Sequence, residues 1–286
     1  MSETSLIRDV SDTALWVAHY RAEESARPDA MFHDPLAARL VGDRGPAIAK
    51  SFGRISRHSA WSIVTRTVMI DDYLREAVAN GVDAVLNLGA GLDTRPYRLE
   101  LPPTFPWVEV DLPHLIEFKE QTLRDQMPRC RLQRVGVNLA DAKERRAFLA
   151  SVLPDSHRVL VLTEGVVPYL TQAQVGELAE ELKLQSRFAF WIAEYYAPHV
   201  YPYLRRIGHS NRMRNAPFQF FPPDWLVFFA QHGWLKHDIR YGLDVGERFN
   251  RRSPLNWFAR LFLRYSAEAR ERLRKGSGYM LMTPRD

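Results

Sequence analysis

One stretch decides the fold: Val85-Leu86-Asn87-Leu88-Gly89-Ala90-Gly91-Leu92-Asp93-Thr94-Arg95. An apolar run, the pattern of a buried strand, leads directly into a tight glycine turn. Glycines are needed where the backbone turns sharply and approaches a ligand without a Cβ in the way. The stretch therefore predicts a strand whose carboxyl end can hold a ligand, although an ordinary strand-to-helix turn explains the glycines equally well.

From Val85 onward, short aliphatic runs alternate with helical patterns, which indicates successive βαβ units. We therefore predict an α/β fold with a doubly wound, mostly parallel sheet of seven strands. The expected strands are Ala84–Leu88, Trp107–Val110, Arg131–Val137, Val159–Thr163, Phe188–Glu194, Leu235–Ile239 and Tyr279–Met282. The expected helices between them are Leu112–Gln126, Lys143–Val152 and Gln172–Gln185.

The glycine turn does not fit a dinucleotide site. That fingerprint needs a third glycine where Thr94 stands, and Pro96 interrupts the expected helix start. About twenty residues later, the second strand ends at Asp111, whose carboxylate can accept both hydroxyls of an adenosine ribose. The pattern favours an adenosine cofactor other than NAD.

The next two strand ends also carry suitable groups. The third ends at Asn138-Leu139, where the amide can accept from the adenine amino group and the leucine can pack on the ring. The fourth ends at Glu164, where the ammonium and sulfonium groups of S-adenosylmethionine need a compensating anion. Four successive strand ends therefore suit this cofactor.

These motifs resemble the leucine carboxyl methyltransferase family, which includes bacterial polyketide O-methyltransferases. The resemblance implies a Rossmann-like methyltransferase fold, with S-adenosyl-L-methionine as cofactor and S-adenosyl-L-homocysteine as product. It extends over nearly the whole chain to about Tyr169. The matching stretches are Gly89 to Arg95, Glu109-Val110-Asp111-Leu112-Pro113 and Thr163-Glu164-Gly165 through Tyr169-Leu170; Ser11-Asp12-Thr13-Ala14 through Arg21-Ala22 and Asp34-Pro35-Leu36-Ala37 are similar to the bacterial branch.

The resemblance also implies residue roles. Arg66 would pair with the methionine carboxylate of the cofactor, unless it is a surface arginine of an amphipathic helix. Tyr169 would face the accepting group as the catalytic candidate, unless it only packs a turn. Where the family has aspartate, this chain has Asn138, whose contact lacks charge assistance. The implied cofactor-binding residues are Arg21, Arg66, Gly89, Ala90, Gly91, Asp111, Leu112, Asn138, Leu139 and Glu164.

We interpret the chain as one methyltransferase domain, residues 1–286. A long amphipathic helix, His58 to Asn80, ends at Gly81 and belongs to an N-terminal helical cap. An insertion rich in Tyr, Arg and Pro follows a strand at the carboxyl edge, where substrate is normally held, and is the expected lid. The divisions are 1–81 for the cap, 82–196 for the cofactor-binding core, 197–223 for the substrate lid and 224–286 for the C-terminal part of the core.

The preferred acceptor is a carboxylate on a small, anionic and partly aromatic metabolite such as a polyketide. A carboxylate is already ionised at neutral pH and needs no general base, whereas a phenol profits from one. His19, His199 and His209 are candidate bases for a phenolic or enolic hydroxyl, the close alternative. A protein C-terminal carboxylate and an inert adenosine-binding module also remain open. The expected substrate-binding residues are Tyr169, Tyr196, Tyr201, Arg205, His209 and Arg212, although the arginines can equally belong to a solvated helix face.

Composition limits the remaining classes. A net charge of +5 without a dense basic, aromatic face does not indicate a nucleic-acid partner. Apolar runs such as Trp225 to Ala230 are far shorter than the roughly twenty residues that cross a bilayer, and no secretory signal pattern opens the chain. The single cysteine, Cys130, supplies neither a disulfide nor a metal cage. We expect a soluble cytoplasmic enzyme without metal, membrane or nucleic-acid partner.

Overall fold

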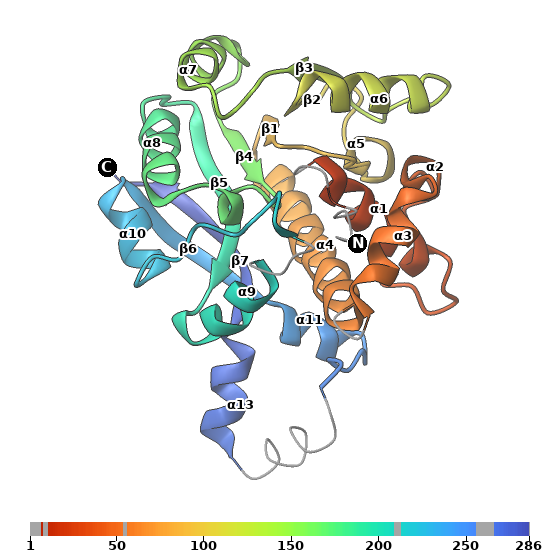
Figure 1. Ribbon diagram of the computed structural model, residues 1–286. Coiled ribbons are helices and arrows are strands. Elements are labelled where there is room, and N and C mark those ends of the chain that lie inside the picture. The colour runs from red at the N-terminus through yellow and green to blue at the C-terminus, as the bar shows by residue number, and fades with distance from the viewer. Residues whose placement is uncertain (1–6, 8–10, 54–55, 209–212, 256–265, 286) are drawn as a thin grey trace.

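One seven-stranded sheet organises the computed structural model, which describes residues 7, 11–53, 56–208, 213–255 and 266–285 (Figure 1). The strand order is β3-β2-β1-β4-β5-β7-β6, and β7 runs antiparallel to both of its neighbours while the other pairs are parallel. This confirms the predicted fold class. The strands are β1 (Ala84–Leu88), β2 (Pro106–Asp111), β3 (Arg131–Gly136), β4 (Val159–Thr163), β5 (Phe188–Tyr196), β6 (Trp234–Tyr241) and β7 (Ser277–Pro284).

The central strands β1 and β4 are buried at every position. Helices cover both faces of the sheet there, so the strands read as continuous apolar runs rather than alternating ones. Beside β1 the chain order reverses, because the chain first builds outward to β2 and β3 and then returns to β4. Ligands bind at such a switch point, beyond the carboxyl ends of the strands. Leu88 is in register with both Val110 and Thr163, so β1, β2 and β4 end side by side.

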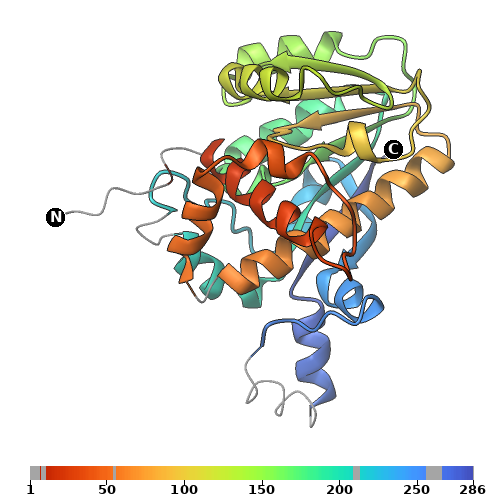
Figure 2. The same ribbon diagram turned by 90° about the vertical axis from the view of Figure 1, so that its right-hand side faces the viewer.

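The two faces of the sheet are covered by different helices, as Figures 1 and 2 show. On one face, α4 buries Val68 and Ile70 in a cluster that contains Val85 and Trp107 of the sheet. On the other, Leu178 of α8 packs with residues of α7 and α10. The first group comprises α4 (Ser56–Ala79) and α11 (Gly242–Arg248); the second comprises α7 (Ala142–Ser151), α8 (Gln172–Lys183) and α10 (Trp225–Gln231).

Local sequence sets the ends of two of these helices. Gly81 follows α4 with φ 85°, a left-handed conformation that suits glycine. Thr171 caps α8, because its side chain accepts from Gln174 N–H while the Gln174 side chain accepts from Thr171 N–H. Both ends lie close to the predicted positions.

The N-terminal helices form a layer of their own beside the carboxyl ends of the strands (Figure 2). Trp16 of α1 stacks on Phe52, with ring centroids 4.4 Å apart and planes 6° apart. None of the described helices is long and apolar enough to cross a membrane. The helices of this layer are α1 (Ser11–Ser25), α2 (Ala37–Val41) and α3 (Arg44–Ser51); the remaining elements are α5 (Arg95–Arg98), α6 (Pro113–Leu123), η2 (Val167–Tyr169), η3 (Pro198–Val200), α9 (Tyr201–Gly208) and α13 (Ala267–Arg274).

Candidate functional site

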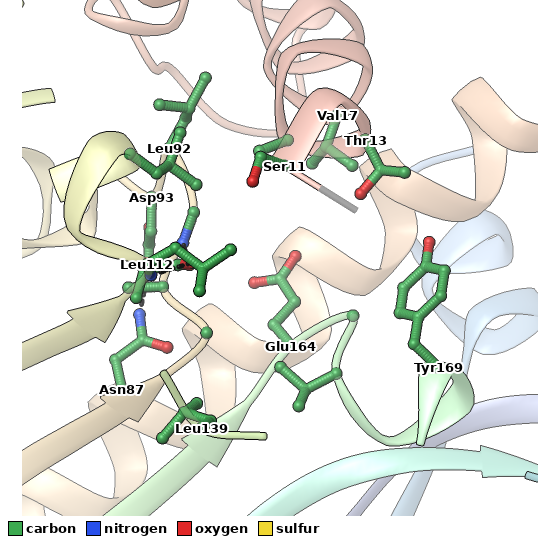
Figure 3. A pocket seen from close by; sticks show the side chains of 18 of the residues that line it. Ser11, Thr13, Val17, Asn87, Leu92, Asp93, Leu112, Leu139, Glu164 and Tyr169 are labelled. Carbon is green, nitrogen blue, oxygen red and sulfur yellow. Dashed lines mark hydrogen bonds between the residues drawn. The ribbon is translucent and has the colours of Figure 1, made fainter. Parts of the chain in front are cut away.

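A cavity of ≈ 370 Å³ lies at the switch point, between the glycine turn, the turn after β4 and helix α1. Figure 3 shows Glu164 near its middle, with Leu112 and Leu139 on one side and Tyr169 on the other. The sequence-predicted residues that line it are Arg21, Arg66, Gly89, Ala90, Gly91, Asp111, Leu112, Asn138, Leu139, Glu164 and Tyr169. All ten implied cofactor-binding residues therefore line the same cavity, together with Tyr169.

The glycine turn forms the floor at one end of the cavity. Gly89 and Gly91 have φ angles of 69° and 49°, which L side chains rarely adopt. The N–H groups of Gly89 and Ala90 donate to Val110 O at 2.8 and 3.0 Å, so the turn is anchored to β2. A Cβ on Gly91 would lie 3.3 Å from the Cβ of Ala14 on α1. Both the backbone angles and the close contact with α1 therefore require a residue without a side chain at Gly91.

Asp111 stands at the end of β2, beside this turn. Its Oδ2 accepts from Gly91 N–H at 2.7 Å, and its Oδ1 accepts from Leu112 N–H at 2.8 Å. Burial raises the pKa of Asp111, while these two donors and Lys119 act in the opposite direction. Each carboxylate oxygen retains acceptor capacity for a ribose hydroxyl. The arrangement fits an adenosine cofactor.

Glu164 is held by two arginines. Its Oε2 accepts from Arg95 Nη1 at 2.6 Å, and its Oε1 lies 2.9 Å from Arg66 Nε. Burial opposes ionisation of Glu164, but Arg95 and Arg66 outweigh it and hold the pKa below its usual range. A lasting negative charge at this position suits a ligand with ammonium and sulfonium groups.

Arg95 organises the charges beneath the cavity. It also donates to Asp93 Oδ2 at 3.0 Å and to Asp71 Oδ1 at 2.7 Å. Asn87 Nδ2 donates to Asp93 as well. The other end of the same amide, the buried Asn87 Oδ1, has no hydrogen-bond partner among the described residues. An unsatisfied acceptor in the wall of the cavity is a ready site for a ligand donor.

Sequence reasoning missed several of these residues. Asp93 and Arg95 lie in the glycine motif, and their charges just after a strand end are a signal that could have predicted a role in the site. Asp71 lies on α4 and gave none. From α1, Ser11, Thr13, Ala14 and Val17 line the cavity; only the resemblance of that stretch to the bacterial branch pointed to it.

Both arginines belong to the site, Arg21 as a buried residue and Arg66 as a half-buried one. The Arg66 side chain is 18% exposed and lines the cavity, which excludes the surface-arginine alternative. Arg21 Nη2 donates to Leu92 O at 2.5 Å, and Nη1 lies 3.4 Å from Asp34 Oδ2. Arg21 therefore fastens α1 to the glycine turn.

Asn138 is exposed, and its side-chain oxygen accepts from Ala140 N–H at 3.0 Å. Leu139, beside it, is half-buried and faces the cavity (Figure 3). The amide therefore shapes its own turn, while the leucine offers an apolar surface for a ring.

At the far end of the cavity, neutral side chains replace the charges. Tyr169 and Thr13 face each other, and burial raises the pKa of Tyr169 while a hydrogen bond with Thr13 lowers it (Figure 3). Phe218 packs edge-on against the Tyr169 ring, with centroids 5.2 Å apart. Gln219 donates to Tyr169 O at 2.7 Å and lines the cavity together with Gln174.

Several expected substrate residues lie outside this lining. Tyr201 is buried in the core and donates to Pro222 O at 2.5 Å, and Tyr196 packs on Trp225 with centroids 5.6 Å apart. The Arg205 guanidinium lies 4.9 Å from the Phe221 ring centroid. None of these three side chains lines the cavity, which corrects the expectation that they bind substrate there: the aromatic groups fold the segment onto the core. His19 and His199 are likewise absent from the lining; His209 and Arg212 lie outside the described residues.

Known proteins match this chain in sequence and in fold. The sequence model of the leucine carboxyl methyltransferase family matches residues 14–183. A putative S-adenosyl-L-methionine-dependent methyltransferase of Frankia alni is 37% identical over 261 residues, 85% of this chain and 89% of its own length. A protein of Streptomyces coelicolor with the same description is 33% identical over 245 residues, 78% of this chain and 82% of its own.

The solved structures support the fold alone. A DUF574 family protein from Streptomyces avermitilis has a TM-score of 0.53 at 13% identity and covers 95% of this chain and 97% of its own. A putative methyltransferase from Thermobifida fusca has the same TM-score at 12% identity and covers 95% and 94%. Because the family model spans more than half of the chain and both relatives match more than two thirds of it, the chain belongs to the leucine carboxyl methyltransferase family.

Proposed function

We propose that this protein is an S-adenosylmethionine-dependent O-methyltransferase that converts a carboxylate of a small, anionic and partly aromatic metabolite, such as a polyketide, into a methyl ester. The cofactor supplies an electrophilic methyl group on a sulfonium. Family membership and the relatives support the cofactor. The acceptor is argued from the cavity.

The chain's own residues divide the cofactor between them. Asp111 would accept from the ribose hydroxyls, and Leu139 would pack against the adenine ring. Glu164 would face the positive groups of the methionine part, and Arg66 would bind its carboxylate. Each of these residues lines the cavity.

The acceptor end carries the proposal. Among the residues that the structure describes, no histidine lines the cavity. Three carboxylates line the described part of the cavity, Asp93, Asp111 and Glu164. Arginines hold the pKa values of Asp93 and Glu164 below the usual range, which makes them poor bases. Asp111 lies beside the glycine turn, at the opposite end from Tyr169, and both of its oxygens accept from backbone N–H groups. A hydroxyl acceptor would need such a base, whereas an ionised carboxylate would not. The absence of a base from this part of the lining favours a carboxylate.

The residues at this end would align the acceptor. Thr13, Tyr169 and Gln219 offer neutral hydrogen-bond donors, which hold a carboxylate without neutralising it. They would hold the acceptor oxygen against the methyl group that the bound cofactor would supply, and the electron pair of the broken carbon–sulfur bond would remain on sulfur. Orientation and exclusion of water supply most of the rate. Residues 197–223, which contribute Phe218 and Gln219, would act as the lid.

The test combines product chemistry with one variant. With a radiolabelled methyl group and a panel of aromatic carboxylic acids, we expect the product to release labelled methanol in mild alkali. Tyr169→Phe should lower kcat/KM about tenfold, because it removes one positioned donor. The matched control Tyr97→Phe removes a hydroxyl that pairs with Arg134, outside the cavity lining, and should leave the rate unchanged. An alkali-stable product would instead show a hydroxyl acceptor.

A further inference from the structure

Glu194 is a buried carboxyl group directly behind the cavity wall. It stands near the carboxyl end of β5 and is 1% exposed. Its Oε1 accepts hydrogen bonds from Gly165 N–H and from the Tyr279 hydroxyl, the latter at 3.1 Å. Its Oε2 has no hydrogen-bond partner among the described residues. Ionisation of this group is therefore opposed by its surroundings.

Glu194 and Glu164 share one cation. The charge of Arg66 favours the ionised form of both carboxyl groups, but only Glu164 has Arg95 as a second partner. Gly165 connects the two groups, because it follows Glu164 in the cavity wall and donates to Glu194. A change of charge in the cavity therefore reaches Glu194 across a single layer of residues.

The groups around Glu194 come from several elements. Burial raises the pKa values of three neighbouring tyrosines, Tyr169, Tyr196 and Tyr279, so their side chains stay neutral near pH 7. Burial raises the pKa of Glu194 to about 7, although its N–H donors and Arg66 lower it. The neighbours are Arg66 on α4, the Gly165 N–H after β4, Tyr169 on η2, Tyr196 on β5 and Tyr279 on β7; Glu164 acts on the same Arg66 and Tyr279.

We propose that Glu194 is a specificity-determining residue that distinguishes the methyl donor from its product by charge, releasing its proton when the sulfonium form binds and retaining it when the thioether form binds. The inference rests on the proposed cofactor site. It concerns the protein's preference between two ligands that fill the same cavity, and it does not depend on which acceptor is methylated.

The two ligands differ in one charge. Both carry the same ammonium and carboxylate groups, so the effect of these groups on Glu194 cancels in a comparison. The sulfonium adds a positive charge near Glu164, and a nearby positive charge favours the ionised form of a carboxyl group. Methyl transfer removes that charge, so Glu194 regains its proton. The affinity for S-adenosylhomocysteine is then lower than that for S-adenosylmethionine.

The experiment is calorimetric titration of the full chain with S-adenosylmethionine and S-adenosylhomocysteine in phosphate and in Tris at pH 7. The difference in heat between the buffers counts released protons. If S-adenosylmethionine lowers the pKa of Glu194 by one unit and S-adenosylhomocysteine does not, binding of S-adenosylmethionine should release about 0.4 proton more from the protein. The ratio of the affinity for S-adenosylmethionine to that for S-adenosylhomocysteine should rise about fivefold between pH 6 and pH 8.

Glu194→Gln tests the assignment, because the amide oxygen can still accept from Gly165 and Tyr279. We expect the extra proton and the pH dependence to disappear. The matched control Glu181→Gln alters a buried carboxylate that pairs with Arg145, outside the cavity lining, and should leave both unchanged. If Glu194→Gln fails to fold, Tyr279→Phe removes one donor to the carboxylate and should shift the pH dependence to higher pH.

Equal proton release by the two ligands, or a pH dependence that survives in Glu194→Gln, would overturn the inference. An unshifted profile in folded Tyr279→Phe would also overturn it. Failure of both ligands to bind the folded protein would overturn the cofactor site itself. The two failures are distinct, because binding without a difference in protons leaves the proposed methyl transfer intact.

Discussion

Arg95 Nη1 lies 2.6 Å from Glu164 Oε2, so the glycine-turn motif supplies the partner of the carboxylate at the middle of the cavity. The same guanidinium contacts Asp93 and Asp71. One side chain thus neutralises charge from a strand end, a turn and a helix. Removing one member of a buried pair leaves its partners uncompensated, which costs more than the pair contributes.

Arg95→Ala should lower the free energy of unfolding by about 3–5 kcal/mol, because it leaves buried carboxylates without their cationic partner. Urea denaturation monitored by tryptophan fluorescence measures this. Arg146→Ala is the control: Arg146 is mostly exposed where it pairs with Glu181, so its loss should cost under about 1 kcal/mol. A small effect at Arg95 would mean that the carboxylates take up protons or water instead.

Asp111→Ala should weaken S-adenosylmethionine binding by roughly tenfold to a hundredfold, because it removes a charged acceptor and releases Gly91 N–H. Calorimetric titration measures the change. Asp125→Asn, an exposed carboxylate that pairs with Arg39 on the surface, serves as the control and should bind normally. Unchanged affinity in Asp111→Ala would place the ribose elsewhere.

Asn138→Asp should tighten cofactor binding about threefold to tenfold. Aspartate keeps the acceptor for Ala140 N–H and adds charge assistance to a contact with the adenine amino group. The same titration measures it. Weaker binding would show that the added charge is repelled by the ligand or by the nearby carboxylates.

Glu194→Gln should change the pH dependence of stability. The pKa of Glu194 is raised to about 7 from an ordinary 4.5, so its contribution is fully present below pH 4.5 and is lost as pH rises through 7. This loss amounts to about 3 kcal/mol. Urea denaturation of the wild type and of Glu194→Gln at pH 5 and pH 8 should show the variant gaining relative stability at pH 8. Parallel curves would contradict the raised pKa.

Tyr201→Phe should cost about 1 kcal/mol of stability and leave the KM for acceptor unchanged, because its hydroxyl donates to Pro222 O in the core. Steady-state kinetics and thermal unfolding separate the two effects. A raised KM with normal stability would return Tyr201 to the substrate site.

The core of the site was predictable because it follows from strand ends. Gly89, Asp111 and Glu164 each follow a strand, and parallel strands bring their carboxyl ends to one edge. The acceptor side was not predictable in the same way. Composition showed tyrosines and arginines in residues 197–223, but the choice between core and cavity for Tyr201 depends on three-dimensional packing. Glu194 likewise lies near the carboxyl end of β5, yet its pairing with Tyr279 depends on β5 and β7 being neighbours in the sheet.

The antiparallel strand β7 lies between β5 and β6, both of which precede it in the chain. During synthesis, β5 therefore presents an open edge and β6 has no place in the sheet until residues 277–284 arrive. Such unpaired edges recruit other strands. A chain cut before residue 277 would lack β7, which joins β5 to β6, and the Tyr279 donor to Glu194. We therefore expect the last part of the sheet and the surroundings of Glu194 to form in the same late step.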